Sequence, residues 1–106
     1  MATIDDFRKL DLRIAQIKEV KIHPNADKLY VLKVECGSEE RQLVAGIRKS
    51  YAAEELVGKR VVLVANLEPA VIRGETSQGM ILAAADENGP ILVSPEKPAA
   101  LGSQVK

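Results

Sequence analysis

The segment Leu10–Ile22, with the sequence LDLRIAQIKEVKI, decides the fold of this chain. Leu12 and Ile14 alternate with charged neighbours, which is the period-two pattern of a strand that buries one face. The phase then slips at Ile17, and apolar residues return to even positions at Val20. A slip within one extended run predicts a β-bulge or strong coiling, which lets one long strand serve two sides of a barrel.

Downstream of this segment, short strand patterns alternate with turn-forming residues. Further strands are predicted over residues 30–36, 41–47, 61–65, 80–85 and 91–93. Ser50 predicts the N-cap of a short helix over residues 51–57 that ends at Gly58, and Asn88-Gly89 predicts a late turn. Three strands, one helix and two or more strands is the order of an OB-fold. We therefore expect an all-β fold with one short helix: a five-stranded Greek-key barrel with a C-terminal extension, forming a single domain over residues 1–106.

The composition narrows the class of protein. A chain of 106 residues, 46% of them hydrophobic, is one domain with enough apolar side chains for a core. Charges interrupt every apolar run before the roughly 20 residues that a membrane span needs. The acidic segment at residues 1–6 lacks the basic and apolar regions of a signal peptide. Cys36 is the single cysteine and fits a reducing compartment. We expect a cytoplasmic protein without membrane contact.

Catalysis has few candidate residues. His23, the single histidine, precedes a proline in a turn, so a structural role is expected. Cys36 lies among apolar strand residues, where a thiol packs rather than attacks. Ser77 lacks the G-x-S-x-G context of a hydrolase nucleophile. No Cys/His pair has zinc spacing, and no Gly-Lys-Ser/Thr loop is present. The sequence predicts a non-catalytic protein without a metal site or a cofactor.

Two turn-forming segments, HPNADKL at residues 23–29 and SQGM at residues 77–80, carry the strongest signal. They fall in the loops that follow the first strand and precede the fifth strand of an OB-fold, which commonly contact oligonucleotides. The ordered set also includes IDDF at 4–7, LDLR at 10–13, VAGI at 44–47 and VANLEP at 64–69. Over essentially the whole chain, this set resembles the tRNA-binding domain family. That domain occurs at the C terminus of methionyl-tRNA synthetases, as free-standing tRNA-binding proteins and in endothelial monocyte-activating polypeptide II.

The resemblance implies tRNA binding without catalysis, as a methionyl-tRNA synthetase domain or beside the catalytic region of one. In the family the Ser-x-Gly-Met segment marks the RNA-binding surface, and Ser77 and Met80 stand at its matching positions. The predicted RNA-binding residues are Asn25, Lys28, Lys33, Arg41, Arg73, Ser77, Gln78 and Met80. The remaining basic residues considered for the same face are Arg48, Lys49, Lys59 and Arg60. Plainer roles remain open: Asn25 as a turn former, Met80 as a core residue, and each cation as solvated surface.

Charge and aromatic content shape the predicted mode of binding. The formal net charge is zero, although residues 8–60 carry twelve Lys/Arg against eight Asp/Glu. A basic face on a neutral protein attracts phosphate locally, but ordinary surface charge explains the same numbers. Phe7, Tyr30 and Tyr51 are the only aromatic residues, too few for stacking platforms along a single strand. Contacts to phosphates, 2′-hydroxyls and the shape of folded RNA are therefore expected.

Two other functions remain open. A sister branch of the family resembles a secretion chaperone that binds unfolded polypeptides, although that branch departs from the HPNADKL segment kept whole here. The second alternative function is a dimerisation or docking domain of a larger synthetase. Free-standing relatives are homodimers, so the resemblance also implies a homodimer, and the tail at residues 101–105 is expected to bury against the partner copy.

Overall fold

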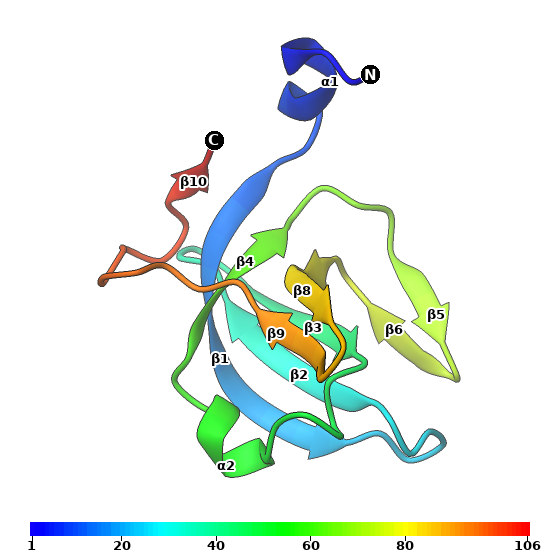
Figure 1. Ribbon diagram of the computed structural model, residues 1–106. Coiled ribbons are helices and arrows are strands. Elements are labelled where there is room, and N and C mark those ends of the chain that lie inside the picture. The colour runs from blue at the N-terminus through cyan, green and yellow to red at the C-terminus, as the bar shows by residue number, and fades with distance from the viewer.

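Strand β1 (Leu12–Ile22) is the centre of the barrel. In the computed structural model, which describes residues 1–106, its first half pairs with β4 (Arg60–Val64) and its second half with β2 (Tyr30–Glu35). The register with β2 shifts between Ile17 and Glu19, so the predicted bulge is confirmed. The curved strand serves two sides of the barrel, as Figure 1 shows.

The strand order is β3-β2-β1-β4-β7, and all neighbours are antiparallel. Strand β3 spans Glu40–Ala45 and β7 spans Met80–Ile81. The Gln78 amide, just before β7, donates to the Gln42 carbonyl at 2.8 Å and helps to close the barrel. The other elements are α1 (Ile4–Arg8), α2 (Ala53–Leu56), β5 (Ala70–Ile72), β6 (Glu75–Ser77), β8 (Ala83–Asp86), β9 (Gly89–Leu92) and β10 (Gln104–Val105). The nearly closed five-stranded antiparallel barrel confirms the predicted OB-type architecture.

The core has two parts on opposite sides of β4. The larger cluster fills the barrel and includes Ile17, Leu32 and Leu43, all fully buried. The smaller cluster contains Leu12, Ile14, Val62 and Val64, and the C-terminal segment covers it with Leu101 and Val105. Residues 61–64 are therefore buried on both faces of β4, as their unbroken apolar run predicts.

The helices differ from the expectation of one short helix, because there are two. Helix α1 begins with a capping box, in which Thr3 Oγ1 accepts the Asp6 amide and the Asp6 carboxylate accepts the Thr3 amide. Helix α2 is shorter than predicted, and its N-cap is Ala52 rather than Ser50. The Ser50 amide instead donates to the Ile47 carbonyl in a turn before the helix. Gly58 does follow the helix, with a φ of 94°.

The second half of the chain holds three further corrections. The predicted loop at residues 68–78 contains the β5–β6 hairpin, whose short strands carry no long period-two pattern. The predicted strand at residues 80–85 is split at Leu82 into β7 and β8. The β8–β9 hairpin turns at Glu87-Asn88 rather than at Asn88-Gly89. The tail also forms a short strand, β10, which pairs with β1 of its own chain, Val105 opposite Leu12.

Candidate nucleic-acid interface

The loop at residues 23–29 and the tip of the β5–β6 hairpin are held together by His23. This side chain is only 2% exposed. Its Nδ1 accepts the Asn25 amide at 3.0 Å, and its Nε2 lies 3.0 Å from the Ile72 carbonyl oxygen. An atom that accepts an amide hydrogen carries none itself, so Nε2 holds the proton and donates it to Ile72. The predicted structural role of His23 is therefore a bridge between two segments far apart in the sequence.

Asn25 and Arg73 reinforce the same bridge. Arg73 Nη2 donates to the Asn25 carbonyl at 3.0 Å, and Asn25 Nδ2 donates to the Arg73 carbonyl at 3.4 Å. Arg73 and Gly74 both have positive φ, 54° and 93°, as a two-residue type I′ hairpin turn requires. We call residues 23–29 and 72–74 the joined loops. Figure 1 shows the β5–β6 hairpin standing beside the barrel with its tip toward the β1–β2 loop.

Ser77 and Gln78 are bound into the barrel. Ser77 Oγ accepts the Val44 amide at 3.0 Å and donates to the Gly79 carbonyl at 2.8 Å, and the residue is 3% exposed. Gln78 Oε1 accepts the Gln42 amide at 3.0 Å, so this side chain continues the strand pairing of β3. The Ser77 hydroxyl is fully bonded within the protein, whereas Gln78 is an exposed residue that uses its Oε1 for this contact. Together these bonds set the course of the chain into β7.

Gly79 completes this segment and presents Met80. Its φ is 124°, and a Cβ on this residue would lie 2.7 Å from the Val64 carbonyl oxygen. Only glycine allows the chain to approach β4 so closely. Met80 follows in register with Val64 and is 46% exposed. It is thus a surface residue rather than a core residue.

Arg41 and Lys33, the two predicted residues on the barrel wall, differ in how free their charged groups are to contact RNA. Arg41 is bound on several sides: its guanidinium contacts the Glu39 carboxylate, the Ala65 carbonyl and, at 3.4 Å, the Gln78 carbonyl. It fastens β3 to the end of β4. Lys33 is exposed on β2, where its amino group lies 3.9 Å from the Glu19 carboxylate. Such an exposed pair contributes little stability and is easily exchanged for a phosphate contact.

The structure thus divides the eight predicted residues into two sets. Asn25, Lys28 and Arg73 lie exposed on the joined loops, Met80 lies exposed at the start of β7, and Lys33 lies exposed on β2. Arg41, Ser77 and Gln78 hold the barrel and the second loop in place. Three further cations have no ion-pair partner in the chain and lie on β1 or in the turn after β3: Lys21, Arg48 and Lys49. Sequence reasoning left out Lys21 and gave Arg48 and Lys49 no preference, although their place after a strand and before Ser50 indicates an exposed turn.

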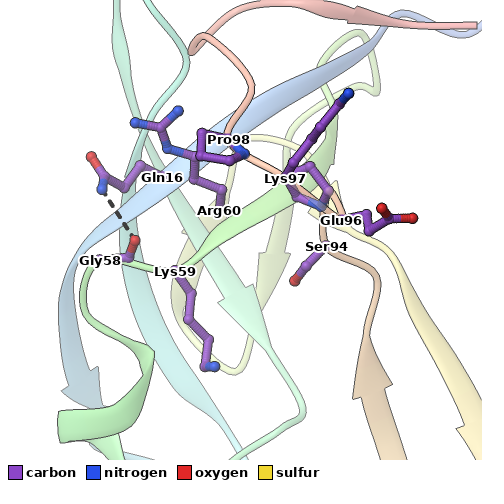
Figure 2. A pocket seen from close by; sticks show the side chains of 9 residues that line it. Gln16, Gly58, Lys59, Arg60, Ser94, Glu96, Lys97 and Pro98 are labelled. Atoms are coloured by element: carbon purple, nitrogen blue, oxygen red, sulfur yellow. Dashed lines mark hydrogen bonds between the residues drawn. The ribbon is translucent and has the colours of Figure 1, made fainter.

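Outside this surface, the largest hollow lies where β4 meets the C-terminal segment. It has a volume of about 540 Å³ and is lined by Lys59, Arg60 and Lys97, among other polar residues. Figure 2 shows the amino groups of Lys59 and Lys97 pointing in opposite directions. The Arg60 guanidinium donates to the Ala99 carbonyl. These cations do not converge on one point, so the hollow is not built to hold a single anion.

The thiol, the possible metal ligands and the helices give no sign of another kind of site. Burial raises the pKa of the Cys36 thiol, and the nearby Glu39 carboxylate raises it further. At neutral pH the thiol therefore stays protonated and is a poor nucleophile. No group of three or more His, Cys, Asp or Glu side chains is arranged to hold a metal ion. Neither helix is long and apolar enough to cross a membrane.

Comparison with known proteins agrees with this geometry. The model of the putative tRNA-binding domain family matches residues 12–104, which include every element of the barrel and the joined loops. The chain belongs to this family. It is 56% identical over 102 residues to the methionine–tRNA ligase of Pyrococcus horikoshii, covering 96% of this chain and 14% of the ligase. It therefore spans about one seventh of the length of that relative.

Solved structures show the same domain in two settings. A MetRS-related protein from Pyrococcus horikoshii superposes with a TM-score of 0.92 at 33% identity, covering 100% of this chain and 98% of that chain. The CsaA chaperone protein from Picrophilus torridus superposes with a TM-score of 0.94 at 31% identity, and both chains are fully covered. The tRNA-binding domain is related to both kinds of protein.

Proposed function

We propose that this domain binds tRNA without catalysis, recognising the shape and phosphate backbone of the folded RNA, and works as part of or beside a methionyl-tRNA synthetase. The observation that carries the proposal is the bridge made by His23 and the Asn25–Arg73 pair. It brings two sequence-distant loops into one exposed edge that carries Lys28 and Arg73. The bridge holds these cations at a constant separation, so they can contact phosphates that a folded RNA also holds at a constant separation.

The mode of binding follows from the available side chains. Lys28, Lys33 and Arg73 neutralise phosphates, and Asn25 donates hydrogen bonds to phosphate or base edges. Met80 offers an apolar surface to a ribose or an unstacked base. Arg41, Ser77 and Gln78 act through the barrel by holding the second loop. A domain of this kind raises the hold of a synthetase on its tRNA, which in this proposal places it in the cytoplasm.

The direct test is a titration of labelled bulk tRNA, with an unstructured RNA of equal length as control, at 50 and 200 mM salt. We expect preference for tRNA and a steep loss of affinity with salt, because phosphate contacts release counterions. Equal affinity for both RNAs would contradict shape recognition. Absence of binding to either RNA would remove the proposed function altogether.

A homodimer forms part of the proposal and is supported by helix α1. This helix has five residues and buries none of them, and Figure 1 shows it projecting from the barrel. So short a helix is unstable in water without packing. Ile4, Phe7 and Leu10 are 61%, 40% and 43% exposed, and with Val105 they line a hollow of about 420 Å³. A second copy of the chain would cover these side chains and double the RNA-binding edge.

Polypeptide binding is the second candidate, and one observation favours it: the close superposition on a CsaA chaperone protein. Exposed apolar residues lie on the same side as the joined loops, with Val71 72% and Ile22 60% exposed. Binding of unfolded polypeptide, measured with a reduced and unfolded test protein, would support this candidate if tRNA binding is absent. The cations of the joined loops favour the RNA.

A further inference from the structure

A hollow lined in part by polar residues adjoins the first of the joined loops and lies apart from the bridge at His23. It has a volume of about 320 Å³. Its walls come from three separate segments: the first loop, the turn after β3, and the β8–β9 hairpin. Four of the lining residues are polar or charged, and the others are two glycines and a proline: Lys28, Gly46, Lys49, Ser50, Asn88, Gly89 and Pro90.

Two hydrogen bonds and one close approach fix the three walls to one another. The Arg48 amide donates to the Lys28 carbonyl at 3.3 Å, which joins the first loop to the turn after β3. The Leu92 amide donates to the Tyr51 hydroxyl at 3.0 Å, which holds the β8–β9 hairpin beside that turn. A Cβ on Gly89 would lie 2.7 Å from Ser50 Oγ, so the hairpin approaches the turn as closely as glycine allows. The hollow is therefore shaped before any ligand arrives.

The chemistry of the lining is that of an anion site. Lys28 and Lys49 are both exposed, and neither forms an ion pair with a carboxylate of the chain. The Ser50 hydroxyl and the Asn88 amide group supply neutral hydrogen-bond donors. The nearby carboxylate of Asp86 accepts a hydrogen bond from the backbone amide of Asn88 at 2.7 Å, which leaves the side-chain amide of Asn88 free. Glu87 lies in the same turn. Two unpaired ammonium groups with neutral donors favour a phosphate, whereas the hairpin carboxylates oppose one.

We propose that this hollow binds a backbone phosphate of the RNA and extends the binding surface from the joined loops onto the β8–β9 hairpin. The inference rests on the proposed function, because the phosphate belongs to the same bound RNA. Lys28 connects the two regions, since it lies on the first loop and also lines the hollow. In this proposal Lys49, which the sequence analysis considered without preference, and Asn88, which it left out, become phosphate-contacting residues.

The test compares Lys49→Gln with Lys59→Gln, which removes the same charge from the hollow of Figure 2. Both side chains are exposed, so both variants should unfold in urea at the wild-type midpoint. We expect Lys49→Gln to weaken tRNA binding by about threefold at 50 mM salt and to lower the salt slope by about one. Lys59→Gln should bind as the wild type does. Glu87→Gln should bind more tightly than the wild type, because it removes a charge that repels phosphate.

The outcomes separate this inference from the proposed function. Wild-type tRNA binding with Lys49→Gln and Lys59→Gln both unchanged would overturn the phosphate site and leave the proposed function standing. Equal weakening by both substitutions would also overturn it, since a general loss of charge would then explain the effect. No tRNA binding by the wild type would overturn both. A salt slope lowered in Lys49→Gln alone, with tighter binding by Glu87→Gln, would establish the site.

Discussion

Ser77 and Met80 lie three residues apart in the same short segment, and the structure gives them opposite surroundings. Ser77 is buried, and its hydroxyl both accepts and donates a hydrogen bond, whereas Met80 is nearly half exposed. Their contributions to binding can therefore be separated by single substitutions.

Ser77→Ala should lower the free energy of unfolding by about 1–3 kcal/mol, because the buried Val44 amide loses its acceptor. Met80→Ala should change it by less than about 0.5 kcal/mol and weaken tRNA binding by about 1 kcal/mol, roughly fivefold. Urea unfolding and tRNA titration of each variant measure the two effects. Loss of affinity in Ser77→Ala under conditions where that variant remains folded, with none in Met80→Ala, would reverse these roles.

Gly79→Ala should lower the free energy of unfolding by about 2 kcal/mol or more. The added Cβ would meet the Val64 carbonyl at 2.7 Å, and the φ of 124° is unfavourable for alanine. Gly58→Ala is the matched control, since Gly58 also has a positive φ of 94° but a Cβ there meets nothing within 4 Å. Urea unfolding should place the control closer to the wild type. Equal losses would mean that the approach to Val64 carries no extra cost.

Cys36 makes stability depend on alkaline pH. Burial and the Glu39 charge raise the pKa of the folded thiol above that of the unfolded chain. Its contribution to stability is complete below the unfolded pKa and declines as the pH rises above about 8.5, where the unfolded chain releases the proton first. Cys36→Ala should show a smaller decline than the wild type between pH 8 and 10 in urea unfolding. Identical pH profiles would rule out this contribution.

At the scale of elements, the β5–β6 hairpin and the β1–β2 loop depend on each other through His23. The short strands of the hairpin lie outside the five-stranded barrel order, so their position rests on the contacts that Ile72, Ser77 and Gln42 make. A short isolated hairpin is at best marginally stable in water.

His23→Ala should therefore free the joined loops from each other while the barrel remains folded. The Asn25 amide loses its acceptor and the Ile72 carbonyl its donor, so the expected cost is about 2 kcal/mol or more. Hydrogen exchange should quicken at the Asn25 amide and stay slow in β2, and tRNA affinity should fall although His23 itself is buried. Unchanged exchange at Asn25 would show that the bridge does not hold the loop.

At the scale of the whole molecule, the apolar surface of α1 predicts self-association. Phe7→Ser should convert a dimer into a monomer in sedimentation at micromolar concentration. Leu67→Ser is the control, because Leu67 is 39% exposed against 40% for Phe7 but lies in the β4–β5 loop. The wild-type unfolding temperature should also rise with protein concentration. A wild-type monomer at high micromolar concentration would refute the dimer.

Local patterning of the chain was enough to predict the barrel. The slip at Ile17, the unbroken apolar run of β4 and the glycine after α2 each express a short-range rule of periodicity or backbone conformation. Such rules act within a few residues, so they can be read without knowing the partners. The same reading failed for α1, the β5–β6 hairpin and β10, which are too short to show a period.

The candidate site depended on tertiary structure to a greater degree. The motif residues located the two loops, but only the fold showed that Ser77 and Arg41 are bonded within the protein and that Lys28 and Met80 are exposed. Asn25, Arg73 and Gln78 are exposed and are also hydrogen-bonded within the protein. The bridge at His23 joins residues 49 positions apart in the chain, and the polar hollow takes its walls from three segments. Whether a polar side chain is buried or free depends on which distant backbone groups lie beside it, and the folded chain alone determines those neighbours.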